Sequence, residues 1–122
     1  MLGYVTLGTN NLEKACAFYD QLMGTIGFTR IFEDGKLFIW GKSLQESAIG
    51  VTTPFNDDPA TVGNGVMVAM QMPDVESVDA FYAKALALGA TDEGAPGPRI
   101  DGFYAGYFRD LDGNKLNAFV FT

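Results

Sequence analysis

Few residues of this chain could perform chemistry, because its 122 residues include no histidine. The usual general base near neutral pH and the commonest metal ligand are therefore both missing. What remains are tyrosine phenols, which can donate a proton, and amides, which can hold an oxyanion. The candidates for these two roles are Tyr4 or Tyr107 as the phenol and Asn117 as the amide. The sequence contains no recognisable activated nucleophile.

The carboxylates and the single thiol do not suggest a metal site or another cofactor. A hard cation would need several carboxylates that converge on one point. Most of the acids here fall instead in expected turns and at expected helix starts: Asp34, Asp57, Asp58, Asp74, Asp92, Asp101, Asp110 and Asp112. Cys16 follows the apolar stripe of an expected helix, which predicts a buried structural thiol. We expect no metal and no other cofactor.

Composition narrows the class of protein. A chain of 122 residues is one domain with a core of its own, and no run approaches the roughly eighteen apolar residues of a membrane span. One cysteine and an N-terminus without a signal-like pattern predict a cytoplasmic protein. Eight basic residues among fifteen acids give a net charge of −7 and no basic face, so nucleic acid is not an expected partner. The acidity favours solubility and, mildly, cationic ligands.

The elements that must position the candidate residues begin with a strand at 2–8. Asn10 and Asn11 can cap the next helix, with Glu13 in capping-box position. Apolar residues then recur at helical spacing as far as Ile26, and Gly24 and Gly27 are expected to end the helix. Shorter apolar runs predict three further strands at 28–32, 37–40 and 47–52. Turn residues predict a linker over 54–64.

The pattern then restarts. We expect a strand at 66–72, a helix opened by Pro73-Asp74 and ended by Gly89, a weakly marked strand near 90–93, a Gly/Pro loop at 94–98, and strands at 103–108 and 116–121. The last two are joined by Asp112-Gly113-Asn114, residue types that accept the positive φ of hairpin turns. This hairpin places Asn117 inside the final strand.

The two halves overlay at one offset. Ala17-Phe18-Tyr19 recurs as Ala80-Phe81-Tyr82 (82 − 19 = 63), and the same offset pairs Tyr4 with Met67 in the first strands. We infer an α+β protein that uses a β-α-β-β-β unit twice, with modules at 1–53 and 65–122 in one domain, 1–122. Each sheet carries one helix on one face. Two such units are expected to curl together around a concave groove, with the helices outside.

The segment from Tyr4 to Asp20 and the final 108–116 hairpin, Phe-Arg-Asp-Leu-Asp-Gly-Asn-Lys-Leu, resemble the vicinal-oxygen-chelate superfamily of glyoxalases, bleomycin resistance proteins and dioxygenases. The resemblance covers essentially the whole chain. It implies two βαβββ modules that form a curved mixed sheet around a central groove. It also implies metal-assisted lyase, isomerase or dioxygenase chemistry, and a homodimer, since members often dimerise.

Residues at the family's metal positions depart from the usual histidine and glutamate. The resemblance implies that these positions are Tyr4, Met67, Asn117 and Ile49. A phenol, a thioether, an amide and an alkyl group do not supply the imidazole, carboxylate or thiolate donors that divalent transition metals need. We therefore expect that no metal binds there.

The resemblance also predicts which residues line the groove. If Tyr4 faces the groove, strand alternation places Thr6, two residues later, on the same side. The same rule selects the inward-facing residues of the second half. The complete predicted ligand-binding set is Tyr4, Thr6, Trp40, Met67, Gln71, Tyr104, Tyr107, Asn117 and Phe119. Alternatives stay open: Trp40 as core, Tyr4 bonded to the opposite sheet, Met67 as packing. Arg99 is either solvated or pairs with an anionic ligand if the 94–98 loop covers the groove.

Three functions follow as hypotheses. The first is a protein that binds a small organic molecule in an aromatic groove without a metal. The alternative is a lyase, isomerase or dioxygenase of the same superfamily that acts on an α-oxo or thiol-adduct substrate, with Tyr4 and Asn117 as the catalytic candidates. The third is an interaction module that forms a homodimer.

Overall fold

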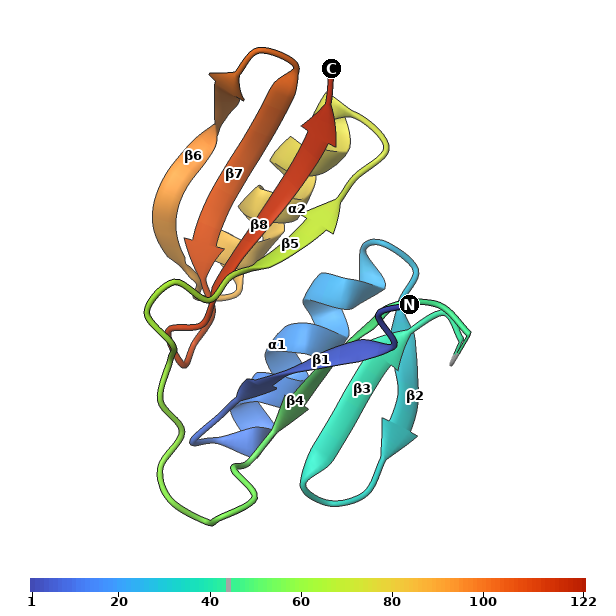
Figure 1. Ribbon diagram of the computed structural model, residues 1–122, viewed down its shortest axis with the longest axis vertical. Helices are drawn as coiled ribbons and strands as arrows, with labels where there is room; N and C mark the ends of the chain where they lie inside the picture. Colours follow the sequence, from blue (N-terminus) through green and yellow to red (C-terminus); the bar gives the residue numbers. More distant parts are fainter. Residues whose placement is uncertain (44) are drawn as a thin grey trace. The chain divides into compact units, whose positions relative to one another are not determined.

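The computed structural model describes residues 1–43 and 45–122. These residues divide into two compact units, Met1–Val62 and Gly63–Thr122. Each unit contains one helix and one four-stranded mixed sheet in the order β-α-β-β-β (Figure 1). The expected α+β fold with two βαβββ modules is confirmed.

The first unit is built from β1 (Tyr4–Gly8), α1 (Leu12–Gly24), β2 (Thr29–Glu33), β3 (Leu37–Gly41) and β4 (Ala48–Thr52). Its strands lie in the order β1-β4-β3-β2. β1 runs parallel to β4, and the other two pairs are antiparallel.

The second unit repeats this arrangement with β5 (Val68–Gln71), α2 (Val75–Ala87), β6 (Thr91–Ile100), β7 (Phe103–Arg109) and β8 (Lys115–Phe121). The strand order is β5-β8-β7-β6, again with one parallel pair, β5 and β8. Both sheets therefore have the same topology.

The helix starts reproduce the predicted repeat. α1 begins at Leu12 and α2 at Val75 (75 − 12 = 63), and each follows a capping residue, Asn11 or Asp74. Each cap accepts a hydrogen bond from the backbone N–H three residues later, which satisfies a group that a helix leaves free at its start. The neighbouring Asn10 is not the cap, because its amide pairs with the backbone N–H and C=O of Ala60 instead.

Each unit buries the face of its sheet that lies against its helix. In the first unit Leu22 and Met23 of α1 are fully buried, and in the second the rings of Phe81 from α2 and Phe108 from β7 lie 6.1 Å apart. Burial of one such side chain contributes about 1.5–3 kcal/mol, so these faces stabilise the units. Cys16 is buried on α1, as predicted, and burial raises the pKa of its thiol. Within the described residues, no helix has the length and apolar character that crossing a membrane requires.

One structural prediction was wrong, namely the Gly/Pro loop at 94–98. These residues belong to the ten-residue strand β6. β6 is the edge strand of its sheet, so it pairs with only one neighbour, β7. An edge strand tolerates its two prolines, because the N–H groups that they lack are not needed for a second neighbour. Its register against β7 shifts at three points, which is typical of bulges. The ring of Pro96 also packs where Gly106 of β7 has no side chain: a Cβ there would lie 2.9 Å from Cγ of Pro96.

Candidate functional site

Four of the predicted site residues share one face of the second sheet. Residues that pair directly across strands project to the same side, and residues two apart along a strand do so as well. Tyr107 pairs with Asn117, and Phe119 pairs with Gln71. These four lie on the side away from α2, because α2 packs against Phe108 on the other side. We call this side the helix-free face of the second sheet; it also carries Phe103 and Phe121.

In the first unit the register places Tyr4 and Thr6 on the side of the sheet away from α1. Thr6 pairs with Gly50 of β4, while the alternate residue Leu7 is buried on the helix side. Tyr4 is half exposed. Tyr4 belongs to the first unit and Asn117 to the second, so within either unit the structure does not bring these two catalytic candidates together.

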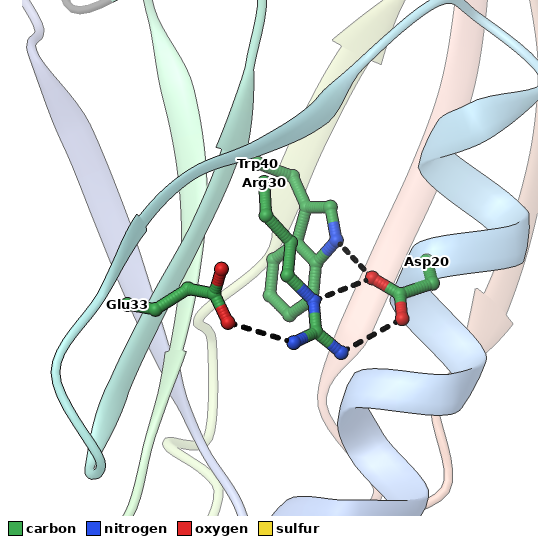
Figure 2. A network of polar contacts seen from close by, with 4 residues as sticks. All are labelled: Asp20, Arg30, Glu33 and Trp40. Atoms are coloured by element: carbon green, nitrogen blue, oxygen red, sulfur yellow. Dashed lines mark hydrogen bonds and ion pairs between the residues drawn. The ribbon is translucent and has the colours of Figure 1, made fainter.

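Trp40 lies on the helix side of the first sheet, which corrects its predicted place beside Tyr4. It pairs with Ile49 of β4, which pairs in turn with Val5, and it is fully buried. Figure 2 shows its indole N–H donating to Asp20 of α1 at 2.9 Å. Arg30 of β2 donates to both oxygens of the same carboxylate at 2.8 Å.

This network is structural. Arg30 also pairs with Glu33 at 3.0 Å, and its guanidinium lies 5.0 Å from the ring centroid of Phe38. The hydrogen bonds from Arg30, and then that from Trp40, hold the pKa of Asp20 below its ordinary value despite an opposing effect of burial. The donors and acceptors of this network bond to one another, and together they link α1 to β2 and β3.

The strand register does not place two further predicted residues on the helix-free face of the second sheet. Tyr104 is on the helix side, where its hydroxyl donates to Asp79 of α2 at 2.6 Å and its pKa is raised by that hydrogen bond. Met67 precedes β5, which begins at Val68, and is exposed. The prediction that Tyr104 shares a face with Asn117 was therefore wrong.

Three phenylalanines form a cluster on the helix-free face of the second sheet. Phe103 stacks on Phe119 with centroids 5.3 Å apart, and Phe121 lies 5.8 Å from the first ring and 5.4 Å from the second. Of these three, only Phe119 belongs to the set predicted from the sequence. Once the final hairpin is paired as Tyr107 with Asn117, the same register brings Phe103 opposite Phe121, so the register was the missing signal.

Two cations from the neighbouring strands lie close to the ring of Tyr107. The guanidinium carbon of Arg99, in β6, is 5.3 Å from its centroid, and Nζ of Lys115, in β8, is 5.5 Å away. Distances below about 6 Å permit cation–π attraction. Lys115 was missed, although it lies two residues before Asn117 and alternation places both on one face. Arg99 and Phe103 also line a hollow of about 410 Å³ at the turn between β6 and β7.

Asn117 has an unusual environment for an amide. It is 1% exposed, and its Oδ1 has no hydrogen-bond partner. More than nine in ten buried polar groups in proteins are paired, and an unpaired one costs about 1–3 kcal/mol. Asn117 is therefore a buried polar group whose acceptor lacks a hydrogen bond.

The residues at the family's metal positions do not fit a metal ion. By register Asn117 pairs with Ala69, and the equivalent pair in the first unit is Gly50 with Thr6 (69 − 6 = 63), so the fourth position is Gly50 rather than the buried Ile49. The fourth position is thus occupied by a glycine, which has no side chain, and not by the alkyl side chain of isoleucine. Among residues 1–43 and 45–122, no group of three or more His, Cys, Asp or Glu side chains could hold a metal.

Comparison with known proteins gives one family. The model of the Glyoxalase/Bleomycin resistance protein/Dioxygenase superfamily matches residues 1–118. The chain is 37% identical to a glyoxalase/bleomycin resistance protein from Albidiferax ferrireducens T118, with a TM-score of 0.91 over 100% of this chain and 99% of the other.

More distant structures support the fold alone. A glyoxalase/bleomycin resistance protein/dioxygenase family enzyme from Burkholderia phytofirmans PsJN is 20% identical, with a TM-score of 0.78 and 98% of each chain covered. A lactoylglutathione lyase from Agrobacterium tumefaciens is 21% identical, with a TM-score of 0.73 over 98% of this chain and 92% of the other. No curated protein matches the sequence.

Proposed function

This chain belongs to the glyoxalase/bleomycin resistance protein/dioxygenase superfamily, and we propose that it binds a small organic molecule on the helix-free face of its second sheet, with no metal at the family's ligand positions. The observation that carries the proposal is the unpaired, buried Oδ1 of Asn117 on the same face as the aromatic cluster. A ligand with a hydrogen-bond donor would satisfy that oxygen.

The aromatic cluster supports the binding of an organic molecule rather than an inorganic ion. Ligand sites are mostly lined by apolar and aromatic side chains with a few polar groups that fix orientation. Phe103 and Phe119 supply the stacking surface, while Gln71 and Asn117 on the same face supply amides. Stacking of one aromatic pair adds about 0.5–1.5 kcal/mol to the burial of its area.

The proposal that no metal occupies the family's positions depends on donor chemistry. A phenol, a thioether, an amide and a glycine stand there, and a divalent transition metal needs imidazole, thiolate or carboxylate ligands. Elemental analysis of untagged protein tests this part. Stoichiometric zinc, nickel, iron or manganese would refute it.

A binding screen tests the main proposal. We expect aromatic compounds from a panel of neutral, anionic and cationic members to raise the melting temperature. Phe119→Ala should weaken the binding of such a compound about tenfold, through lost stacking and lost apolar contact. Phe55→Ala is the matched control, because Phe55 is almost fully exposed and lies in the other unit. If no compound in the panel binds in a way that depends on Phe119, the proposal is wrong.

A further inference from the structure

We infer that the ligand of this face is a small aromatic carboxylate that also carries a hydroxyl or N–H group, held by Arg99 and Lys115 beside Tyr107. This inference rests on the proposed function and names the chemical class of its ligand.

Arg99 differs from the other two arginines in its partners. Arg30 pairs with Asp20 and Glu33, and Arg109 pairs with Glu93 at 2.9 Å. Arg99 has no carboxylate partner in the described part of the chain, although acids outnumber bases by fifteen to eight. A cation left without an acid in so acidic a protein is available to an external anion.

The guanidinium of Arg99 is nevertheless fixed in place. It donates to the carbonyl oxygens of Ala95 at 2.6 Å and Gly97 at 3.0 Å, within its own strand. Two glycines leave room for it, since a Cβ at Gly94 or Gly97 would lie 3.2 Å from one of its nitrogens. The Gly/Pro composition of β6 thus holds the guanidinium over Tyr107 before any ligand arrives. A preorganised donor loses less entropy on binding than a free one.

Lys115 provides a second charge near the ring of Tyr107. It also lacks a carboxylate partner among residues 1–43 and 45–122, and its Nζ is 5.5 Å from the ring centroid. Two cations around one ring create a positive patch that a carboxylate can neutralise. The net charge of −7 by itself favours cationic ligands mildly, and this patch reverses that preference locally. The same overall charge repels a dianion more than a monoanion, which favours a carboxylate.

Asn117 requires a second functional group on the ligand, in addition to the carboxylate. Its buried Oδ1 is an acceptor, and a carboxylate has no proton to donate to it at neutral pH. A hydroxyl or N–H next to the carboxylate can supply the missing hydrogen bond, because Asn117 pairs directly with Tyr107 across the strands. The ligand therefore has an anionic group and a donor close together.

The aromatic part of the ligand has a matching surface along the same strand. Phe119 lies four residues beyond Lys115 in β8, a separation of about 13 Å at the usual rise of a strand. A carboxylate joined to one ring by a short chain spans most of this distance. Phe103, which stacks on Phe119, lines the hollow at the β6–β7 turn together with Arg99.

Calorimetric titration with four related probes tests the inference. They are 3-phenylpropanoate, its neutral methyl ester, which has no hydrogen-bond donor, 3-phenylpropylammonium, and 3-phenyllactate, which adds a hydroxyl beside the carboxylate. We expect the carboxylate to bind about tenfold more tightly than the ester and the ammonium compound not to bind, since a charge-assisted hydrogen bond is roughly twice as strong as a neutral one. The added hydroxyl should strengthen binding about fivefold or more through Asn117.

Variants assign each contact. Arg99→Gln and Lys115→Gln should each weaken 3-phenylpropanoate binding about tenfold, whereas Lys42→Gln, an equal change of charge at an exposed site in the other unit, should not. Gly97→Ala keeps all charges and places a Cβ 3.2 Å from the guanidinium, which must move by a few tenths of an ångström, so it should weaken binding less than Arg99→Gln does. Asn117→Val, or Asn117→Ala if the first variant does not fold, should bind both carboxylates equally and so remove the gain from the hydroxyl.

The outcomes separate the two proposals. If the methyl ester binds as tightly as the carboxylate, or if the Arg99 and Lys115 variants behave like Lys42→Gln, the inference about the anion is overturned. A hydroxyl that gives no gain overturns the role of Asn117. In either case, binding that still depends on Phe119 would leave the proposed function standing, and loss of all such binding would remove both.

Discussion

Removal of the Asp20 carboxylate should destabilise the first unit mainly through Trp40. The carboxylate accepts the indole N–H of Trp40 and a two-pronged pair from Arg30 (Figure 2). In Asp20→Ala the indole N–H loses its partner while the ring stays fully buried. The guanidinium, in contrast, is about one third exposed and can turn to water.

The magnitude follows from this difference in burial. A buried donor left unpaired costs about 1–3 kcal/mol. The ion pair of Asp20 and Arg30, with side chains 42% and 32% exposed, contributes about 0–1 kcal/mol after solvent screening. We therefore expect Asp20→Ala to lower the free energy of unfolding by about 2–3 kcal/mol. Glu33→Ala, which removes only an exposed ion pair of the same arginine, should lower it by about 0.5 kcal/mol or less.

Urea unfolding measures both changes. Trp40 is the only tryptophan, so its fluorescence reports on the first unit, and far-ultraviolet circular dichroism follows the whole chain. The sign of the pH dependence follows from the lowered pKa of Asp20. A carboxyl whose pKa is lowered by folding stabilises the fold at any pH above its ordinary pKa. It loses that effect as the pH falls through its pKa in the folded protein. The gap between wild type and Asp20→Ala should therefore shrink below about pH 4.

A double-mutant cycle can refute this reasoning. Trp40→Phe removes the indole N–H, so a subsequent Asp20→Ala should cost less than about 1 kcal/mol, the part that belongs to Arg30. If Asp20→Ala costs as much in Trp40→Phe as in wild type, the unpaired indole is not the cause. Equal losses for Asp20→Ala and Glu33→Ala would lead to the same conclusion.

Two further predictions concern the second unit. Gly106→Ala should lower the free energy of unfolding by about 1–3 kcal/mol, because its Cβ would lie 2.9 Å from the Pro96 ring. The control is Gly3→Ala, whose Cβ would have no neighbour within 4 Å and which should change that free energy by less than about 0.5 kcal/mol. Urea unfolding measures both changes. The hydrogen bond to Asp92 raises the pKa of Tyr82 to about 12, so its stabilising effect is present below pH 10 and is lost as the pH rises toward 12. Ultraviolet titration should show tyrosines that ionise late, Tyr82 and Tyr104 among them; Asp92→Asn should move one of them to lower pH, and an unchanged titration would contradict the assignment.

Much of the fold could be predicted because it depends on local patterns. The helix starts needed only a capping residue and apolar spacing, and the repeat at 63 residues placed Val75 once Leu12 was known. The alternation of β8 likewise placed Asn117 and Phe119 on one face, because that alternation is a property of a single strand.

The errors arose where a side chain depends on a neighbouring strand. The phase of Trp40 is set by its pairing with Ile49 in β4, and nothing within 37–40 alone decides which side faces α1. The Gly/Pro composition of 94–98 predicts a loop from propensity, yet an edge strand with one neighbour tolerates both prolines. At residues 94–98 the pairing with β7 therefore outweighs the loop propensity of glycine and proline.

The same error concealed the cation on which the ligand class depends. As part of a loop, Arg99 could only be considered a solvated side chain or a lid residue. As part of a bulged strand, it lies over Tyr107 with its nitrogens held by the carbonyl oxygens of Ala95 and Gly97. Asn117, where the resemblance implies a metal-binding carboxylate, has an unpaired acceptor and pairs across the strands with the same Tyr107. This amide, together with Arg99 and Lys115 near Tyr107, is the combination from which we infer a carboxylate ligand rather than a metal ion.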